Sequence, residues 1–224
     1  MIEVIDLSKS YAKNHQILSN VCIKLDDNRI HFLMGKNGSG KTTFIKCLLG
    51  LEGYEGCITF GGKPVHRIQD RLFAIFDDVP LYDNLNGYQN IRLLLEDSGT
   101  CDPKKIEELS LLSSHKLRKR VKDYSLGEKK KLALIAALLQ KPKYLFIDEI
   151  SNGLDAETLE ILQENLKKLK KESLILVTGH HFDFYEKIID ELYIIRDNTI
   201  THIIDYAKGG ETLHDFYRKY LQNH

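Results

Sequence analysis

The stretch Gly35-Lys-Asn-Gly-Ser-Gly-Lys41-Thr42-Thr43 decides the fold, because an apolar run, Ile30 to Met34, precedes it and a helical pattern, Thr42 to Leu49, follows it. It matches G-x-x-x-x-G-K-[ST], in which glycines let backbone N–H groups turn inward around phosphates. Lys41 is expected at the β and γ phosphates, and the Thr42 hydroxyl on Mg²⁺. A purely structural glycine turn is the alternative, and Lys41-Thr42 at the required offset disfavours it.

A second chemical element is the apolar run Tyr144 to Ile147, which ends in Asp148 and Glu149. A buried strand that delivers an aspartate at its C-terminal end completes the Mg²⁺ shell of a P-loop enzyme. Glu149, one residue further, is expected to point to the other side of the strand and to deprotonate a water for attack on the γ-phosphate. The alternative is an acid pair that caps a following helix, which the presence of the phosphate loop in the same chain disfavours.

The pattern around these two elements predicts a mainly parallel sheet covered on both faces, because helices and strands alternate from Ser125 onward. The expected helices are Lys130 to Leu139 and Ala156 to Lys171, and the expected strands are Leu174 to Thr178 and Leu192 to Ile195. Earlier in the chain, alternation predicts strands at Ile2 to Leu7, Ile17 to Leu25 and Cys57 to Phe60, with a turn at Lys13-Asn14-His15. Between about Asp83 and Lys122, leucines recur at helical spacing and Asp102-Pro103 marks a helix start, which indicates a helical insertion.

Composition excludes several classes of protein. The 224 residues carry 32 Lys+Arg against 32 Asp+Glu, so nothing points to a nucleic-acid partner. The basic run His115 to Lys122 contains no interleaved aromatic residue and is interpreted as a solvated helix face. The cysteines at 22, 47, 57 and 101 lack metal-ligand spacing, which favours a reducing cytosol. The start of the chain does not read as a signal peptide, and the longest apolar run, Leu132 to Leu139, is too short to span a bilayer.

Three further short motifs follow the loop in order along the chain. They are Tyr124-Ser125-Leu126-Gly127-Glu128, Asn152-Gly153-Leu154-Asp155 and Val177-Thr178-Gly179-His180. With the loop and the two carboxylates, they resemble the nucleotide-binding subunits of ABC transporters over nearly the whole chain. In that family they correspond to the signature (usually LSGGQ), the D-loop and the switch-histidine segment.

The resemblance implies a fold and its domain organisation. The fold is an α/β P-loop NTPase (RecA-like) core with a mainly parallel sheet, an N-terminal antiparallel β subdomain and an inserted helical subdomain. We expect a single ABC ATPase domain over residues 1–224. Its catalytic core with the β subdomain would comprise residues 1–77 and 124–224, and its helical subdomain residues 78–123.

The resemblance also implies the roles of individual residues. Tyr11 sits where the family places the aromatic that stacks on adenine, although a hairpin aromatic lying on the sheet is the alternative. His180 would contact the γ-phosphate and orient Glu149, with the adjacent His181 read as a surface histidine. Ser125 and Gly127 would contact the γ-phosphate held by a second subunit. ATP is then expected at Tyr11, Gly35, Asn37, Gly38, Ser39, Gly40, Lys41, Thr42, Thr43, Ser125 and Gly127, with Lys41, Glu149 and His180 in catalysis.

Three departures from the family pattern stand out. The signature has Leu126 in place of glycine and Glu128 in place of glutamine. Asp77 occupies the position of the Q-loop glutamine, and a carboxylate there can also bind Mg²⁺, beside Thr42 and Asp148. An acidic residue at this position resembles the bacitracin-resistance and lantibiotic-immunity branch. No segment like TEVGERG precedes the signature, which argues against exporters with fused membrane domains.

These features predict an ATP-hydrolysing subunit that uses ATP and Mg²⁺, dimerises on ATP with a second copy or a close paralogue, and powers a separate membrane permease. The expected location is the cytoplasm, on the inner face of the cell membrane through that permease. The Asp77 hint favours export of a peptide or antimicrobial. Two alternatives stay open: a non-transport ABC ATPase with a soluble partner, of the cluster-assembly type, and a catalytically weak regulatory subunit.

Overall fold

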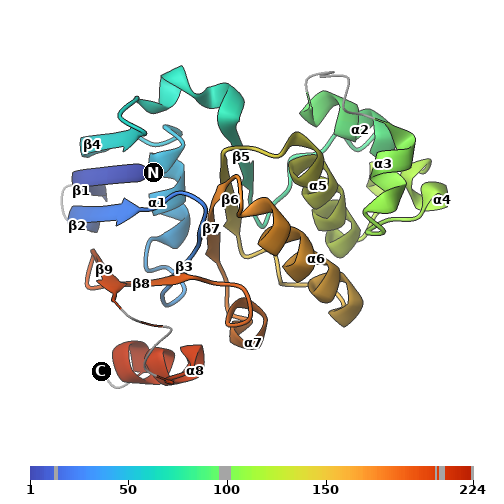
Figure 1. Ribbon diagram of the computed structural model, residues 1–224. Coiled ribbons are helices and arrows are strands. Elements are labelled where there is room, and N and C mark those ends of the chain that lie inside the picture. Colours follow the sequence, from blue (N-terminus) through green and yellow to red (C-terminus); the bar gives the residue numbers. More distant parts are fainter. Residues whose placement is uncertain (13–14, 96–101, 205, 207–209, 223–224) are drawn as a thin grey trace.

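A six-stranded sheet forms the centre of the computed structural model, which describes residues 1–12, 15–95, 102–204, 206 and 210–222 (Figure 1). The strand order is β5-β6-β7-β3-β8-β9. All neighbouring strands are parallel except β8 and β9, which are antiparallel. The strands are β3 (Ile30–Met34), β5 (Leu72–Ile75), β6 (Tyr144–Asp148), β7 (Leu174–Thr178), β8 (Glu191–Arg196) and β9 (Thr199–Ile203). The predicted fold class is confirmed, although the sequence patterns missed β5 and the edge strand β9.

A three-stranded antiparallel sheet stands beside the central one, with the order β2-β1-β4. Its strands are β1 (Ile2–Ala12), β2 (His15–Leu25) and β4 (Glu55–Phe60). β1 and β2 are longer than predicted because register shifts and positive φ angles at Asp6 and Asn20 interrupt the alternation without ending the pairing. In the predicted turn Lys13-Asn14-His15, residues 13 and 14 lie outside the described residues, and His15 begins β2.

Two hydrophobic cores fill the space on the two faces of the central sheet. Alternate residues of β6 enter different cores: Leu145 and Ile147 pack on one side, and Tyr144 and Phe146 on the other. Helix α1 (Lys41–Leu48) lies on the second side, between the two sheets, as the left half of Figure 1 shows. Because both faces are covered, the central strands are almost continuously apolar, as expected for a parallel sheet.

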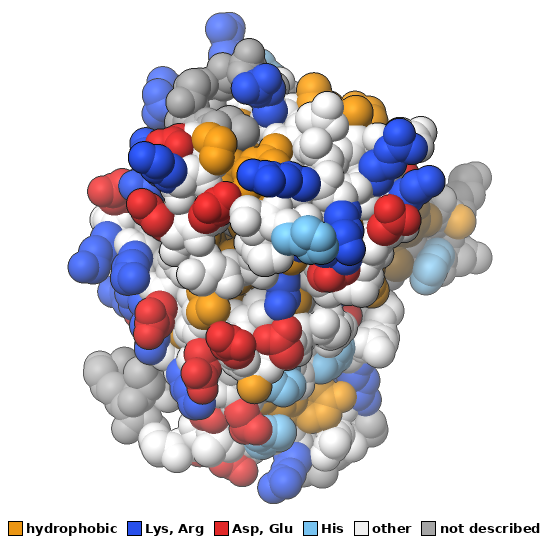
Figure 2. Space-filling model, turned by 90° about the vertical axis from the view of Figure 1, so that its right-hand side faces the viewer, with side chains coloured by type: hydrophobic (Ala, Val, Ile, Leu, Met, Phe, Trp, Pro, Cys, Tyr) orange, Lys and Arg blue, Asp and Glu red, His pale blue; other side chains and the backbone are white. Residues whose placement is uncertain are grey.

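Helices α5 (Leu126–Gln140) and α6 (Ala156–Leu169) cover the first side, on the right of Figure 1. Three short helices lie further out: α2 (Gly87–Leu94), α3 (Pro103–Glu108) and α4 (Ser114–Leu117). All three fall between residues 78 and 123. On this face Lys and Arg side chains are interspersed with Asp and Glu, with hydrophobic side chains between them (Figure 2).

The remaining elements are short. They are the helices α7 (Phe182–Tyr185) and α8 (Leu213–Tyr217), a π-helical turn at Arg218–Gln222, and 3₁₀ turns at Val65–Arg67, Gln69–Arg71 and Val121–Asp123. In the described part of the chain, no helix has the length and apolar character that a bilayer span requires.

The start of α5 corrects one sequence-based expectation. The helix was predicted to begin at Lys130, where the apolar pattern starts, but it begins at Leu126. Ser125 is its N-cap: the Ser125 hydroxyl accepts a hydrogen bond from the Glu128 backbone N–H (3.2 Å), and the Glu128 carboxylate accepts one from the Ser125 N–H (2.7 Å). This capping box explains the polar first turn, which hydrophobic periodicity does not detect.

Candidate nucleotide-binding site

The predicted phosphate loop connects β3 to α1 at the carboxyl edge of the central sheet. Gly38 and Gly40 have φ angles of 75° and 105°, which L-residues rarely adopt. A Cβ atom at Gly40 would lie 2.7 Å from the Ile17 side chain, so this position also lacks room for a larger residue. Since Gly40 is the N-cap of α1, the backbone N–H groups of the first turn face the loop.

Lys41 lies under the loop, and its side chain is buried. Its ammonium donates to the carbonyl oxygens of Gly35 (3.0 Å) and Lys36 (3.1 Å), and lies 3.9 Å from Glu149 Oε1. Burial lowers the pKa of Lys41, while Glu149 and Asp148 act in the opposite direction. The loop therefore holds a cation in a partly dehydrated position, where its attraction for phosphate oxygens is strong.

Asp148 ends β6, and its carboxylate accepts hydrogen bonds from two hydroxyl groups. Thr42 donates to Asp148 Oδ2 (2.6 Å), and Thr178, at the end of the neighbouring strand β7, donates to Asp148 Oδ1 (2.5 Å). Carboxyl ends of parallel strands meet at one edge of the sheet, which explains why residues far apart in sequence converge here. The sequence motif that contains Thr178, Val177-Thr178-Gly179-His180, did not indicate a role for this threonine.

Glu149 follows directly on Asp148 but does not continue the strand. Its φ of 54° turns the backbone, and its N–H lies 3.2 Å from both Thr178 O and Thr178 Oγ1. The expectation that Glu149 points to the other side of the strand is therefore wrong: both carboxylates line one cavity. Strand alternation does not extend through a residue with positive φ.

Among the described residues, three polar side chains lie close to the Glu149 carboxylate. His180 Nε2 lies 3.4 Å from Oε1, Lys41 lies 3.9 Å from the same oxygen, and the Asn152 amide donates to Oε2 (3.2 Å). His180 Nε2 is buried and lies within ion-pair distance of the carboxylate, but makes no aligned hydrogen bond. His181 is exposed and precedes α7.

Tyr11 lies at the outer rim of the same cavity and is 52% exposed. Its hydroxyl lies 3.4 Å from Thr43 Oγ1 and 3.3 Å from Glu52 Oε1. The Lys9 ammonium lies 4.7 Å from the ring centroid and pairs with Glu52 (3.0 Å). These contacts hold the ring beside the phosphate loop.

Ser125 and Gly127 do not line the cavity that contains Lys41. Gly127 instead packs against the segment after β6: a Cβ atom there would lie 2.4 Å from the carbonyl oxygen of Gly153. Leu126, between them, is 54% exposed. Asp77 does line the cavity, and its carboxylate contacts the buried ammonium of Lys130, a residue that sequence reasoning did not single out.

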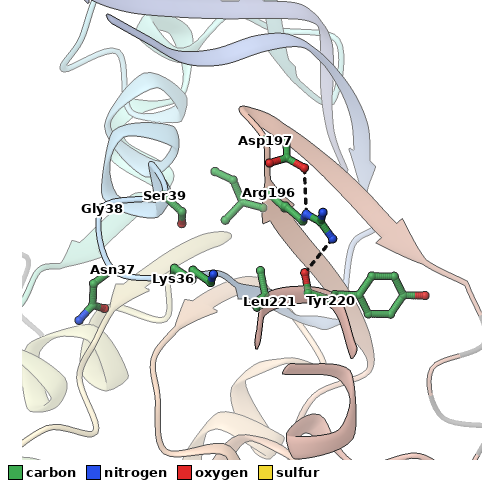
Figure 3. A pocket seen from close by; sticks show the side chains of 9 residues that line it. Lys36, Asn37, Gly38, Ser39, Arg196, Asp197, Tyr220 and Leu221 are labelled. Atoms are coloured by element: carbon green, nitrogen blue, oxygen red, sulfur yellow. Dashed lines mark hydrogen bonds and ion pairs between the residues drawn. The ribbon is translucent and has the colours of Figure 1, made fainter. Parts of the chain in front are cut away.

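Two cavities adjoin the phosphate loop. The larger, of about 490 Å³, contains Tyr11, Lys41, Thr42, Asp148 and Glu149. The smaller, of about 270 Å³, lies between the loop and the C-terminal segment and is lined by Lys36, Asn37, Gly38, Ser39, Ile195, Arg196, Asp197, Tyr220 and Leu221 (Figure 3). There Asp197 and the Tyr220 carbonyl hold the Arg196 guanidinium. The larger cavity is the candidate nucleotide site, because Lys41, Asp148 and Glu149 line it.

The oxygen atoms of the larger cavity fit Mg²⁺. Thr42 Oγ1 and Asp148 Oδ2 are already adjacent, and Asp77 lines the same cavity. Mg²⁺ prefers oxygen ligands and takes one or two carboxylates together with substrate phosphates rather than an all-protein cage. The described residues contain no group of three or more His, Cys, Asp or Glu side chains that could hold a metal ion.

Comparison with known proteins identifies the family. The sequence model of the family described as "ABC transporter" matches residues 18–152. The chain belongs to the ABC transporter family. It is an ATPase whose ATP hydrolysis is coupled to transport.

Two of the relatives carry names that match the branch suggested by the acidic residue at position 77. The chain is 31% identical over 225 residues to the lantibiotic transport ATP-binding protein SrtF of Streptococcus pyogenes, with 99% of this chain and 97% of the relative covered. It is 29% identical to the bacitracin transport ATP-binding protein BcrA of Enterococcus faecalis, over 99% of this chain and 73% of the relative. A solved ATP-binding subunit of an ABC transporter is 26% identical, with a TM-score of 0.80 over 98% of this chain and 93% of that structure.

Proposed function

We propose that this ABC transporter subunit hydrolyses ATP at the larger cavity, as one of two subunits that close on ATP and drive a separate membrane permease. The convergence of Lys41, Thr42, Asp148, Glu149 and His180 at one edge of the sheet carries the proposal. In it, the phosphate loop and Lys41 hold the triphosphate, and Tyr11 stacks on adenine. Thr42 and Asp148 would hold Mg²⁺, which would supply positive charge beside the phosphate oxygens.

Glu149 is the proposed general base. Its carboxylate takes a proton from a water whose oxygen attacks the γ-phosphorus, and ADP leaves. His180, 3.4 Å from Glu149, orients the carboxylate and the water. Ser125 and Gly127 complete the site of the other subunit, which accounts for their position outside the Lys41 cavity of their own chain.

Glu149→Gln tests this assignment. The amide keeps the shape and the contact with Asn152 but cannot accept the proton, so we expect the ATPase rate to fall by about 100-fold or more. Size-exclusion chromatography with ATP and Mg²⁺ should then show a stable dimer. Glu160→Gln, at an exposed carboxylate on α6, is the matched control and should hydrolyse ATP normally. A Glu149→Gln variant that turns over at the wild-type rate would exclude Glu149 as the base.

The proposed substrate class is a peptide or antimicrobial that is exported. The acidic residue at position 77 and the names of SrtF and BcrA support it. Nothing favours the alternative of a soluble, cluster-assembly partner. The test is detergent co-purification: we expect an integral membrane permease whose reconstituted ATPase activity rises with a lantibiotic or with bacitracin. A soluble scaffold in its place would refute transport by this subunit, and a permease stimulated by neither peptide would refute the substrate class.

A further inference from the structure

Lys130, on α5, is a charged side chain with no exposure to solvent. Its ammonium lies 2.5 Å from Asp77 Oδ1 and donates to the backbone carbonyls of Glu149 (3.2 Å) and Asn152 (3.0 Å). A lysine ammonium has three N–H donors, and three partners surround this one. Two of the partners lie in the turn after β6, and the third lies in the segment that leads from β5 toward α2.

Stability alone does not explain a lysine at this position. A buried ammonium loses its hydration, and an ion pair in the interior usually regains little more than that loss. An apolar side chain of similar length would fill the same space without removing a charge from water. The three hydrogen bonds of Lys130 instead fix the geometry between the turn after β6 and the segment that leads from β5 toward α2.

The turn after β6 depends on such external contacts. Glu149 has a φ of 54°, a strained conformation for a non-glycine residue that persists only when its surroundings enforce it. On one side, the Glu149 N–H is held by Thr178. On the other side, the Glu149 carbonyl is held by Lys130. The direction of the Glu149 carboxylate follows from this clamped backbone.

Asp77 contributes differently from the two carbonyl groups. Its side chain is 58% exposed and lines the nucleotide cavity, whereas the lysine that it contacts is fully buried. Among the described residues, Asp77 is the carboxylate within ion-pair distance of Lys130. A change in the position of Asp77 would therefore alter the interactions of the same ammonium that donates to the Glu149 and Asn152 carbonyls.

We propose that Lys130 is a positioning residue for ATP hydrolysis. Its contacts fix the position of the Glu149 and Asn152 backbone relative to Asp77. It links the segment leading into the helical subdomain to the residue that activates water. The inference rests on the proposed function, because Glu149 must be the base for its placement to matter. Lys130 touches neither nucleotide nor water in this proposal, so its loss should affect turnover rather than binding.

Lys130→Met provides the first test, on the full chain. Methionine fills the space without a donor, so we expect kcat to fall by about tenfold or more, since small displacements of a catalytic group are costly. The KM for ATP and the Kd of a fluorescent ATP analogue should stay within about threefold. Lys129→Met, next on the same helix, breaks the exposed pair with Asp83 and is the matched control, with unchanged kcat. A Lys130→Met variant with wild-type kcat, or with kcat and KM changed in parallel, would overturn the proposal.

Lys130→Gln is the second variant, which is used if Lys130→Met does not fold. Glutamine retains an amide donor for one of the carbonyls, so kcat should lie between those of wild type and Lys130→Met. If the melting curves show that neither variant folds, Lys130 is a residue of stability and the positioning role is refuted.

A double-mutant cycle tests the link to Asp77. If the two residues act as a unit, Asp77→Asn combined with Lys130→Met should reduce kcat no further than Lys130→Met alone. Losses that multiply would show that Asp77 acts independently of Lys130. Glu149→Gln separates this inference from the proposed function: if Glu149→Gln is inactive and Lys130→Met fully active, only the positioning role fails, whereas an active Glu149→Gln removes the basis of both.

Discussion

At the residue scale, the sequence predicts those site residues whose roles depend on a local motif. Lys41, Thr42 and Asp148 converge as the spacing and the strand pattern indicated, with Thr42 donating to Asp148. Lys130 could not be found this way, because a lysine in a helix rich in lysines is normally exposed. Only the three-dimensional convergence of Asp77 with the turn after β6 shows that this lysine is buried.

Tyr11 allows a sharp test at this scale, because its ring and its hydroxyl make separate contacts. If the ring stacks on adenine, Tyr11→Ala should weaken ATP binding by about tenfold, given about 1–3 kcal/mol for an aromatic–base stack. Tyr11→Phe removes the hydroxyl contacts with Thr43 and Glu52 but keeps the ring, and should bind ATP within about threefold of wild type. Titration calorimetry with ATP measures both variants.

Tripolyphosphate, which has no base, provides the control for the Tyr11 variants. Its affinity should be the same in wild type and Tyr11→Ala, because the phosphate loop is unchanged. Unaltered ATP affinity in Tyr11→Ala would mean that the tyrosine is a hairpin aromatic and not a stacking residue.

At the scale of elements, α5 shows what hydrophobic periodicity omits. The pattern located the buried part of the helix, but the residues proposed to contact nucleotide lie at its polar start, which the capping box of Ser125 and Glu128 organises. Because glutamate serves in a capping box as well as glutamine does, the departure at Glu128 from the family signature is structurally neutral. Lys116 adds an ion pair with the same carboxylate, 2.7 Å away.

Gly127 has a second role at this scale, because it lets the first turn of α5 pack against the D-loop. Alanine is favoured over glycine in a helix by about 1 kcal/mol, so Gly127→Ala would stabilise an unobstructed helix. The 2.4 Å approach of its Cβ to the Gly153 carbonyl predicts the opposite, a loss of about 1–3 kcal/mol. Thermal unfolding without nucleotide measures it, with the exposed Leu126→Ala on the same turn as the control. A higher melting temperature for Gly127→Ala would contradict the packing.

At the scale of the whole molecule, the residues proposed to contact nucleotide lie in two separate places on one chain. The cavity that holds Lys41 and the carboxylates does not include Ser125 or Gly127. Lys41 and the carboxylates converge because each lies at or just beyond the carboxyl end of a strand of the central sheet. Ser125 instead begins α5, on the outside of that sheet. The family resemblance already implies a second chain, and the position of Ser125 and Gly127 outside the Lys41 cavity supports that proposal.

Mixing two inactive variants tests the shared site. Lys41→Ala disables the phosphate loop, and Ser125→Asp keeps a good N-cap for α5 while placing a negative charge against the phosphate. Each variant alone should have almost no ATPase activity, because both sites of its dimer are defective. In a mixed dimer one site combines the intact loop of the Ser125→Asp chain with the intact signature of the Lys41→Ala chain. Equal mixing should therefore restore about a quarter of the wild-type rate, for random pairing and independent sites of a symmetric dimer. Mixtures that stay inactive at concentrations where wild type dimerises would mean that two copies of this chain do not complete each other's sites.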